Sequence, residues 1–204
     1  GSFVAVFGSE NETIVFDSGK PEDFKAIVKT LRNYGSENIT ALVLTRNSPD
    51  AYGNVQALTT IFDVQKIYHN GLAAYQEPVM SVKDFIPNEA VSSDKTVQVG
   101  SVQLRFIVPY DDSKGFLDAP EDNAILVKVS YGARTLLYAS SCGLNCEGRV
   151  KDANLQSAVL ITASRGGCDG TTQFFLNRVS PEVAITQGAP CEEVKERLAN
   201  SNVK

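Results

Sequence analysis

The most informative stretch of this sequence is Leu42-Val43-Leu44-Thr45-Arg46-Asn47-Ser48-Pro49-Asp50-Ala51-Tyr52-Gly53-Asn54. It begins with a short apolar run and continues into a polar segment that contains a proline and a glycine. A short apolar run bounded by turn residues is typical of a buried strand, and Pro and Gly mark the loop that follows. The stretch therefore predicts a buried strand that ends near Thr45 and carries a polar loop at its C-terminal end.

The composition predicts a single globular domain. The chain has 204 residues, of which 43% are hydrophobic, and this is enough to build one sizeable core. We expect the domain to span residues 3–204, because Gly1-Ser2 resembles the remnant of an expression vector. No apolar run approaches the roughly 18 residues of a membrane span. We therefore expect a soluble domain whose natural anchor, if it has one, lies outside this sequence.

The charged and titratable residues exclude some function classes. A net charge of -5 with a pI near 5.0 opposes broad non-specific binding of nucleic acid, which needs a basic face. The chain has one histidine, whereas a zinc enzyme normally uses several. His69 lies at a predicted strand end, before an Asn-Gly turn, and this position favours a structural or solvent-exposed side chain.

Strand and helix patterns alternate along the chain. Phe24, Ile27, Val28 and Leu31 have the spacing of one apolar helix face, and Pro21 opens that helix with Ser18 as its expected cap. The remaining predictions are hairpins over 3–16, 96–108 and 124–138, strands over 39–45, 64–68, 159–162 and 181–186, and helices over 54–62, 171–176 and 192–198. Residues 71–94 predict a loop with one short element, and residues 111–122 predict a polar loop.

The opening stretch and this order of elements resemble the metallo-β-lactamase superfamily. In that family the loop after the matching strand reads T-H-x-H-x-D-H. Here Arg46, Ser48 and Ala51 stand at the histidine positions, and of the ligands only Asp50 remains. The resemblance implies an α+β fold, namely the four-layer αβ/βα sandwich of the family.

Later segments are similar to one branch of the family, which includes the soluble domain of competence-type DNA-uptake channels. The segment from Asn123 to Gly132 matches its N-x-x-S-h-V-h-x-h-x-y-G pattern in part. Ser141 stands where that branch has the aspartate of T-G-D, and Ser164 and Arg165 stand at the histidine pair of G-H-H-G-S. The last loop keeps Gly188 but has no histidine.

The resemblance thus implies a metal site that has lost its ligands. The former metal-site positions are Arg46, Ser48, Asp50, Ala51, Ser141, Ser164 and Arg165. A lone carboxylate does not hold zinc, so we expect no metal and no cofactor. Asp50 would be costly to bury unpaired, so we expect one of the two arginines, Arg46 or Arg165, to pair with it. The other arginine would then form a small anion-binding site.

The four cysteines lie in loops that the resemblance places near the former metal site. We expect the disulfides Cys142–Cys146 and Cys168–Cys191, which would link loops that have lost a shared metal. A four-thiolate zinc site and four free thiols are the alternatives. Disulfides would imply an oxidising compartment or the cytoplasm of a hyperthermophile.

Together these features favour a catalytically inactive domain that acts as a binding or structural module. We expect an extracellular or membrane-anchored extracytoplasmic part of a DNA-uptake-type membrane protein, with the membrane-embedded portion of that protein or nucleic acid as partner. The alternative is a nuclease-like residual hydrolase with a remodelled site. Ser141, Ser164 or Cys168 would be its nucleophile, but each needs a base, and His69 is the only histidine.

Overall fold

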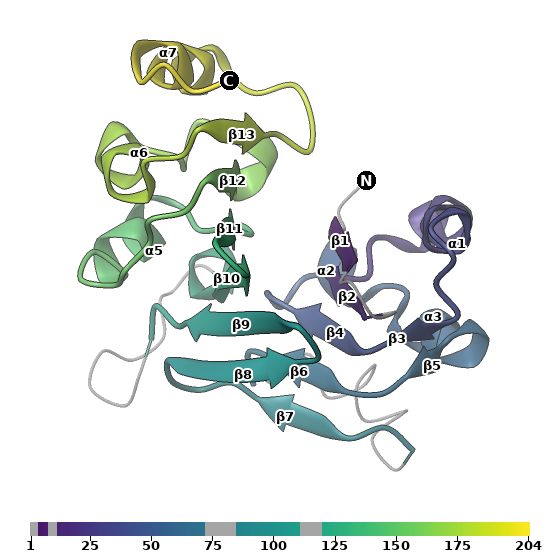
Figure 1. Ribbon diagram of the computed structural model, residues 1–204. Helices are drawn as coiled ribbons and strands as arrows, with labels where there is room; N and C mark the ends of the chain where they lie inside the picture. The colour runs from purple at the N-terminus through teal and green to yellow at the C-terminus, as the bar shows by residue number, and fades with distance from the viewer. Residues whose placement is uncertain (1–3, 8–11, 72–84, 111–119) are drawn as a thin grey trace. The chain divides into compact units, whose positions relative to one another are not determined.

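The computed structural model describes residues 4–7, 12–71, 85–110 and 120–204 (Figure 1). The chain forms two compact units: unit 1 comprises residues 1–91 and 98–101, and unit 2 comprises residues 92–97 and 102–204. The expectation of one domain over residues 3–204 stays a prediction. Residues 111–119 of the loop predicted at 111–122, and most of the segment 71–94, lie outside the described residues, and the end of that predicted loop forms a 3-10 helix over Pro120–Asn123.

Unit 1 is built on a five-stranded sheet with the strand order β1-β2-β4-β6-β7 (Figure 1). β1 and β2 form the predicted antiparallel hairpin, whereas β2, β4, β6 and β7 run parallel to one another. The predicted strand 39–45 is interrupted at Thr40, and its first residues pair with β5 in a separate two-stranded sheet. The strands of unit 1 are β1 Val4–Phe7, β2 Thr13–Phe16, β3 Asn38–Ile39, β4 Ala41–Leu44, β5 Asp63–Val64, β6 Ile67–His69 and β7 Asn88–Ala90.

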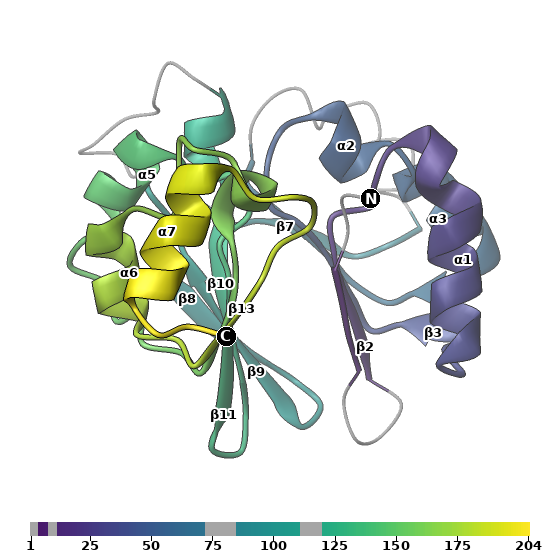
Figure 2. The same cartoon turned by 90° about the horizontal axis from the view of Figure 1, so that it is seen from above.

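The α-helices in the described part of unit 1 are α1 Phe24–Asn33, α2 Pro49–Tyr52 and α3 Val55–Ile61 (Figure 2). Ile27 and Leu31 of α1 are buried with Leu42 and Leu44 of β4 and Leu58 of α3 in one core cluster, which confirms the predicted apolar helix face. The expected cap is wrong. A 3-10 turn over Pro21–Asp23 precedes α1, and the Ser18 hydroxyl instead accepts the backbone N–H of Asn54 at 3.0 Å.

Unit 2 is built on a six-stranded sheet with the order β13-β12-β11-β10-β9-β8. β9, β10 and β11 run antiparallel, and β11, β12 and β13 run parallel. The predicted hairpin over 124–138 is present with its turn at Gly132, where φ is +56°. The strands are β8 Lys95–Val99, β9 Val102–Ile107, β10 Leu126–Tyr131, β11 Arg134–Tyr138, β12 Val159–Ile161 and β13 Val183–Ile185.

The helices of unit 2 are α5 Leu144–Arg149, α6 Gln173–Val179 and α7 Glu192–Asn200. Phe175 and Leu176 of α6 and Cys146 of α5 are buried with Leu137 and Leu160 of the sheet. Thr172 caps α6, because its hydroxyl accepts the N–H of Phe175 at 3.1 Å. The sequence did not predict α5. None of the helices in the described ranges is both long and apolar enough to span a bilayer.

Parallel strands bring the loops of interest to common edges. In unit 1, the C-terminal ends of β2 and β4 lie side by side, because Phe16 pairs with Val43. In unit 2, the ends of β11 and β12 do the same, because Tyr138 pairs with Ile161. The residues that follow these strands, Asp17 and Thr45 in unit 1 and Ser140 and Thr162 in unit 2, are buried.

Candidate functional site: a buried arginine between two carboxylates

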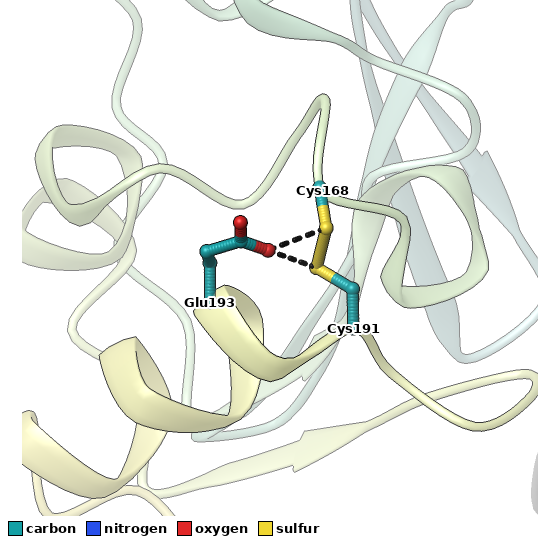
Figure 3. Close-up of side chains that lie close together, drawn as sticks. All are labelled: Cys168, Cys191 and Glu193. Carbon is teal, nitrogen blue, oxygen red and sulfur yellow. Dashed lines mark hydrogen bonds between the residues drawn. A yellow bond between two sulfur atoms is a disulfide. The ribbon is translucent and has the colours of Figure 1, made fainter.

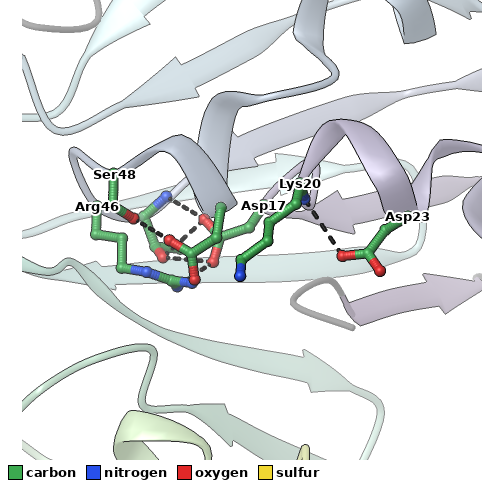
Figure 4. Close-up of polar contacts among 7 residues, drawn as sticks. Asp17, Lys20, Asp23, Arg46 and Ser48 are labelled. Atoms are coloured by element: carbon green, nitrogen blue, oxygen red, sulfur yellow. Dashed lines mark hydrogen bonds and ion pairs between the residues drawn. The ribbon is translucent and has the colours of Figure 1, made fainter.

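Asp17 is the centre of a buried polar cluster at the end of β2. Its side chain is fully buried, and it accepts the backbone N–H of Thr45 at 2.8 Å. The Thr45 hydroxyl lies 2.9 and 3.0 Å from the two carboxylate oxygens. Nη1 of Arg46 lies 2.6 Å from Oδ2 of Asp17 (Figure 4). Asp17 therefore receives donors from the backbone and from two side chains of the loop after β4.

Arg46 joins this cluster to Asp50. Its Nη2 atom lies 2.8 Å from Oδ2 of Asp50, and the Ser48 hydroxyl donates to the other oxygen of that carboxylate (Figure 4). Arg46 is only 5% exposed. The ion pair expected between Asp50 and one of two arginines is therefore present, and the arginine is Arg46. The second carboxylate, from Asp17, was not expected.

The Arg46 cluster does not fit a metal ion. A guanidinium stays protonated in proteins and has no lone pair to offer a metal. Both oxygens of Asp50 already accept hydrogen bonds, from Arg46 and Ser48. Ala51 is fully buried and carries no donor atom. The positive charge between the two carboxylates is that of the Arg46 guanidinium.

Backbone contacts fix the loop around this cluster. The Ser18 N–H donates to the carbonyl of Ala51 at 2.5 Å, and Nδ2 of Asn54 donates to the carbonyls of Ser18 and Lys20 at 2.8 and 2.6 Å. Gly53 is required by close packing, because a Cβ atom there would lie 2.6 Å from a backbone oxygen of Pro49. The loop is thus rigidly held without a metal.

In unit 2, Ser141, Ser164 and Arg165 stand at the positions where the resemblance implied metal ligands. Ser164 donates its hydroxyl to Asp169 at 3.3 Å, and Arg165 is exposed. Ser141 is partly buried. Ser140, Ser164 and Arg165 have φ values of 54°, 47° and 59°, as Asp17 has 59° in unit 1. Left-handed backbone at residues other than glycine costs roughly 1–3 kcal/mol each and clusters at functional sites. Strained backbone is therefore present in the loops of both units.

Both expected disulfides are present in unit 2. Cys142 is bonded to Cys146, and Cys168 is bonded to Cys191, so the described residues contain no free cysteine. In the described ranges, the group of His, Cys, Asp and Glu side chains close enough to share a metal is Cys168, Cys191 and Glu193. The disulfide removes both thiolates from that group, and neither the zinc site nor the free thiols of the alternatives is found.

Glu193 lies over the exposed disulfide (Figure 3). Its Oε2 atom is 2.6 Å from Sγ of Cys168 and 3.2 Å from Sγ of Cys191. A disulfide sulfur carries no proton, so a hydrogen bond across this contact forms only when Glu193 itself is protonated. Cys191 is the residue before α7, and the disulfide therefore ties the start of that helix to the loop after β12.

Two titratable residues outside the Arg46 cluster, Glu147 and His69, accept hydrogen bonds from backbone N–H groups. Glu147 of α5 is 2% exposed and accepts the N–H of Thr172 at 3.3 Å and its hydroxyl at 2.5 Å. Burial raises the pKa of Glu147, although the Thr172 hydrogen bonds and the charge of Arg197 act against that shift. His69 accepts the N–H of Gly71 through Nδ1 at 3.1 Å, and burial lowers its pKa. Nothing in the sequence pattern indicated Glu147, because its partner lies 25 residues away.

Comparison with known proteins identifies the family of this chain. Residues 1–184 match the model of the metallo-beta-lactamase superfamily. The chain is 26% identical over 204 residues to the competence protein ComA of Neisseria gonorrhoeae, a match that covers 95% of this chain and 28% of that protein. The chain therefore spans less than a third of the length of this relative.

Solved structures show the same fold at low sequence identity. The metallo-beta-lactamase fold protein YhfI from Bacillus subtilis has a TM-score of 0.62 at 11% identity, over 95% of this chain and 83% of that one. Zn²⁺-bound PqqB from Methylobacterium extorquens has a TM-score of 0.57 at 13% identity, over 78% and 58% of the two chains. The expected fold class, an α+β sandwich, is confirmed. The chain belongs to the metallo-beta-lactamase superfamily.

Proposed function

We propose that this chain is a catalytically inactive metallo-β-lactamase-fold domain that serves as a binding or structural module. The observation that carries the proposal is the position of Arg46 between Asp17 and Asp50, at 2.6 and 2.8 Å. A fixed cation at this place repels a divalent metal and occupies the carboxylate that the metal would need. Without a metal, the fold has no activated water for hydrolysis.

We further propose that the module belongs to a DNA-uptake-type membrane protein and lies outside the cytoplasm. The similarity to a competence protein over 95% of the chain supports the first part. The two disulfides support the second, because disulfides persist in oxidising compartments. The module's partner would be the membrane-embedded portion of the same protein or the nucleic acid that it handles.

Metal analysis tests the loss of activity. The purified protein is incubated with excess Zn²⁺ or Mn²⁺, passed over a desalting column and analysed by mass spectrometry for metals, with a zinc-binding protein such as PqqB treated in parallel. We expect far less than one metal ion per chain and no cleavage of plasmid DNA. Close to one bound metal per chain, together with DNA cleavage that a chelator abolishes, would establish the residual hydrolase instead.

Thiol trapping in living cells tests the location. The gene product is expressed in a bacterial host and treated with a maleimide that does not cross membranes, before and after reduction. An extracytoplasmic domain gains label only after reduction, because Cys168 is exposed but oxidised. Reduced cysteines that react only after cell lysis would place the domain in the cytoplasm.

A further inference from the structure

Helix α1 and the end of α3 form a groove in unit 1, and none of its lining residues belongs to the Arg46 cluster. It is lined by Phe24, Lys25, Val28, Lys29, Arg32 and Asn33 of α1 together with Ile61 of α3, and its volume is about 410 Å³. Phe24 and Val28 are partly buried against the core of unit 1, while Ile61 is 41% exposed. The groove therefore presents apolar side chains to solvent.

Three cations follow one edge of this apolar floor. Lys25, Lys29 and Arg32 are exposed and occupy positions i, i+4 and i+7 of α1, so they form a row about 11 Å long on one side of the helix. Within the described ranges, no carboxylate forms an ion pair with any of the three. The nearby Asp23 carboxylate instead accepts the backbone N–H of Lys20 at 3.3 Å (Figure 4).

This concentration of positive charge is local. The chain as a whole carries a net charge of -5, and its other cations in unit 1 include Arg46 and Lys66, which are both paired with carboxylates. A row of unpaired cations beside exposed apolar side chains is complementary to a ligand that is apolar on one face and acidic at its border.

We propose that this groove binds an acidic amphipathic segment of a partner protein, most simply a helix. Apolar side chains of the segment would cover Val28 and Ile61, and carboxylates one turn apart would meet Lys25, Lys29 and Arg32. A concave site of this volume fits a row of side chains, whereas a bilayer surface is broad and favours a convex or flat face. The proposal goes beyond the inactive-domain proposal and does not depend on it.

Direct binding of a designed peptide tests this inference. The probe is a fluorescent peptide of about 15 residues, with leucine at i, i+3, i+4 and i+7 and glutamate on the flanking positions. A second peptide carries lysine at every glutamate position. Fluorescence anisotropy is measured at low salt and at about 0.5 M salt, where charges interact over only a few ångströms. Vesicles of phosphatidylcholine and phosphatidylglycerol form a separate arm.

Matched variants locate the binding. Lys25→Glu/Lys29→Glu reverses two charges of the groove, and Arg134→Glu/Lys151→Glu reverses two exposed charges of unit 2. Ile61→Ser removes part of the floor, and Ile185→Ser removes a comparably exposed isoleucine of β13, which is 48% exposed. Circular dichroism melts establish that each variant is folded. We expect about tenfold weaker binding of the acidic peptide by both groove variants, unchanged binding by both controls, and no binding of the lysine peptide.

Each other outcome overturns the inference. Equal binding by the groove and control variants would place the peptide elsewhere on the protein. Absence of peptide binding, with vesicle binding that the Lys25→Glu/Lys29→Glu variant loses, would assign the groove to an anionic membrane surface. Absence of binding to both probes would mean that the groove is an ordinary solvated surface.

Discussion

Replacing Arg46 with methionine keeps most of the side-chain volume and removes the charge that contacts Asp17 and Asp50. Asp17 is fully buried, so the substitution leaves an ionised carboxylate in the interior without its cation. Removing one partner of a buried ion pair costs about 3–5 kcal/mol. Asp17 still accepts the N–H and the hydroxyl of Thr45, so we expect a loss near the lower end, about 3 kcal/mol.

Asp50→Ala should cost less than Arg46→Met. It leaves the Arg46–Asp17 pair intact and removes the hydrogen bonds that Arg46 and Ser48 donate to a carboxylate whose side chain is 12% exposed. Such bonds are worth about 1.5–3 kcal/mol, and partial exposure places the expected cost near the lower value. The double variant Asp17→Asn/Arg46→Met should be more stable than Arg46→Met alone, because it no longer buries an unpaired charge.

Urea unfolding followed by circular dichroism measures these differences, and thermal melts provide a second estimate. For a chain of this length, about 3 kcal/mol corresponds to a decrease in Tm of roughly 6–12 °C. Arg134→Met, at an exposed position of β11, serves as control and should stay within about 0.5 kcal/mol of the parent. A melting temperature of Arg46→Met within one degree of the parent protein would show that the ion pairs of Arg46 with Asp17 and Asp50 do not stabilise the fold.

Three further predictions concern unit 2 and His69. Cys168→Ser/Cys191→Ser removes a disulfide that joins residues 23 apart and should lower the free energy of unfolding by about 3 kcal/mol. Urea unfolding under non-reducing conditions measures this difference, and an unchanged free energy of unfolding would contradict a stabilising role of the disulfide. Because the pKa of Glu147 is raised in the folded protein, its contribution to the free energy of unfolding is present below pH 4.5 and is lost as the pH rises through the folded-state pKa. Unfolding curves measured over a pH series should therefore show a smaller loss of stability with rising pH in Glu147→Gln than in the parent protein. The lowered pKa of His69 gives the opposite pH dependence, because the free energy of unfolding should fall as the pH drops below about 6.5. If His69→Gln loses stability over the same pH range, His69 is not the cause of the loss.

Much of the fold was predictable because its elements are amphipathic. The apolar spacing of α1 and the alternation of β9 and β10 were sufficient to predict these elements. α5 was missed because Leu144-Asn145-Cys146-Glu147-Gly148-Arg149 has no helical apolar period and contains a glycine. The break at Thr40 was missed because the run from Ile39 to Leu44 is uniformly apolar apart from that residue, and its hydroxyl accepts the N–H of Thr13, 27 residues away.

The site was predictable only in part, because some of its contacts join residues that are far apart in the sequence. The chemistry of the side chains indicated that Asp50 pairs with Arg46 or Arg165, and the structure has the local pair, Arg46 and Asp50, four residues apart. The Arg46–Asp17 pair joins residues 29 apart, and it depends on the register between two parallel strands. A turn aspartate that accepts backbone bonds and an aspartate that also holds a buried arginine have the same local sequence. Which of the two roles the aspartate has depends on the register of the neighbouring strands, and the local sequence pattern does not specify that register.

The left-handed backbone at Asp17, Ser140 and Ser164 has a consequence for how such a domain changes over time. These loop shapes are imposed by the strands and packed helices around them, because residues with a Cβ atom do not adopt them without such support. The shape of these loops should therefore persist when exposed side chains within them are exchanged. A laboratory evolution experiment that sought to build a metal site here would exchange side chains and leave the loop lengths as they are.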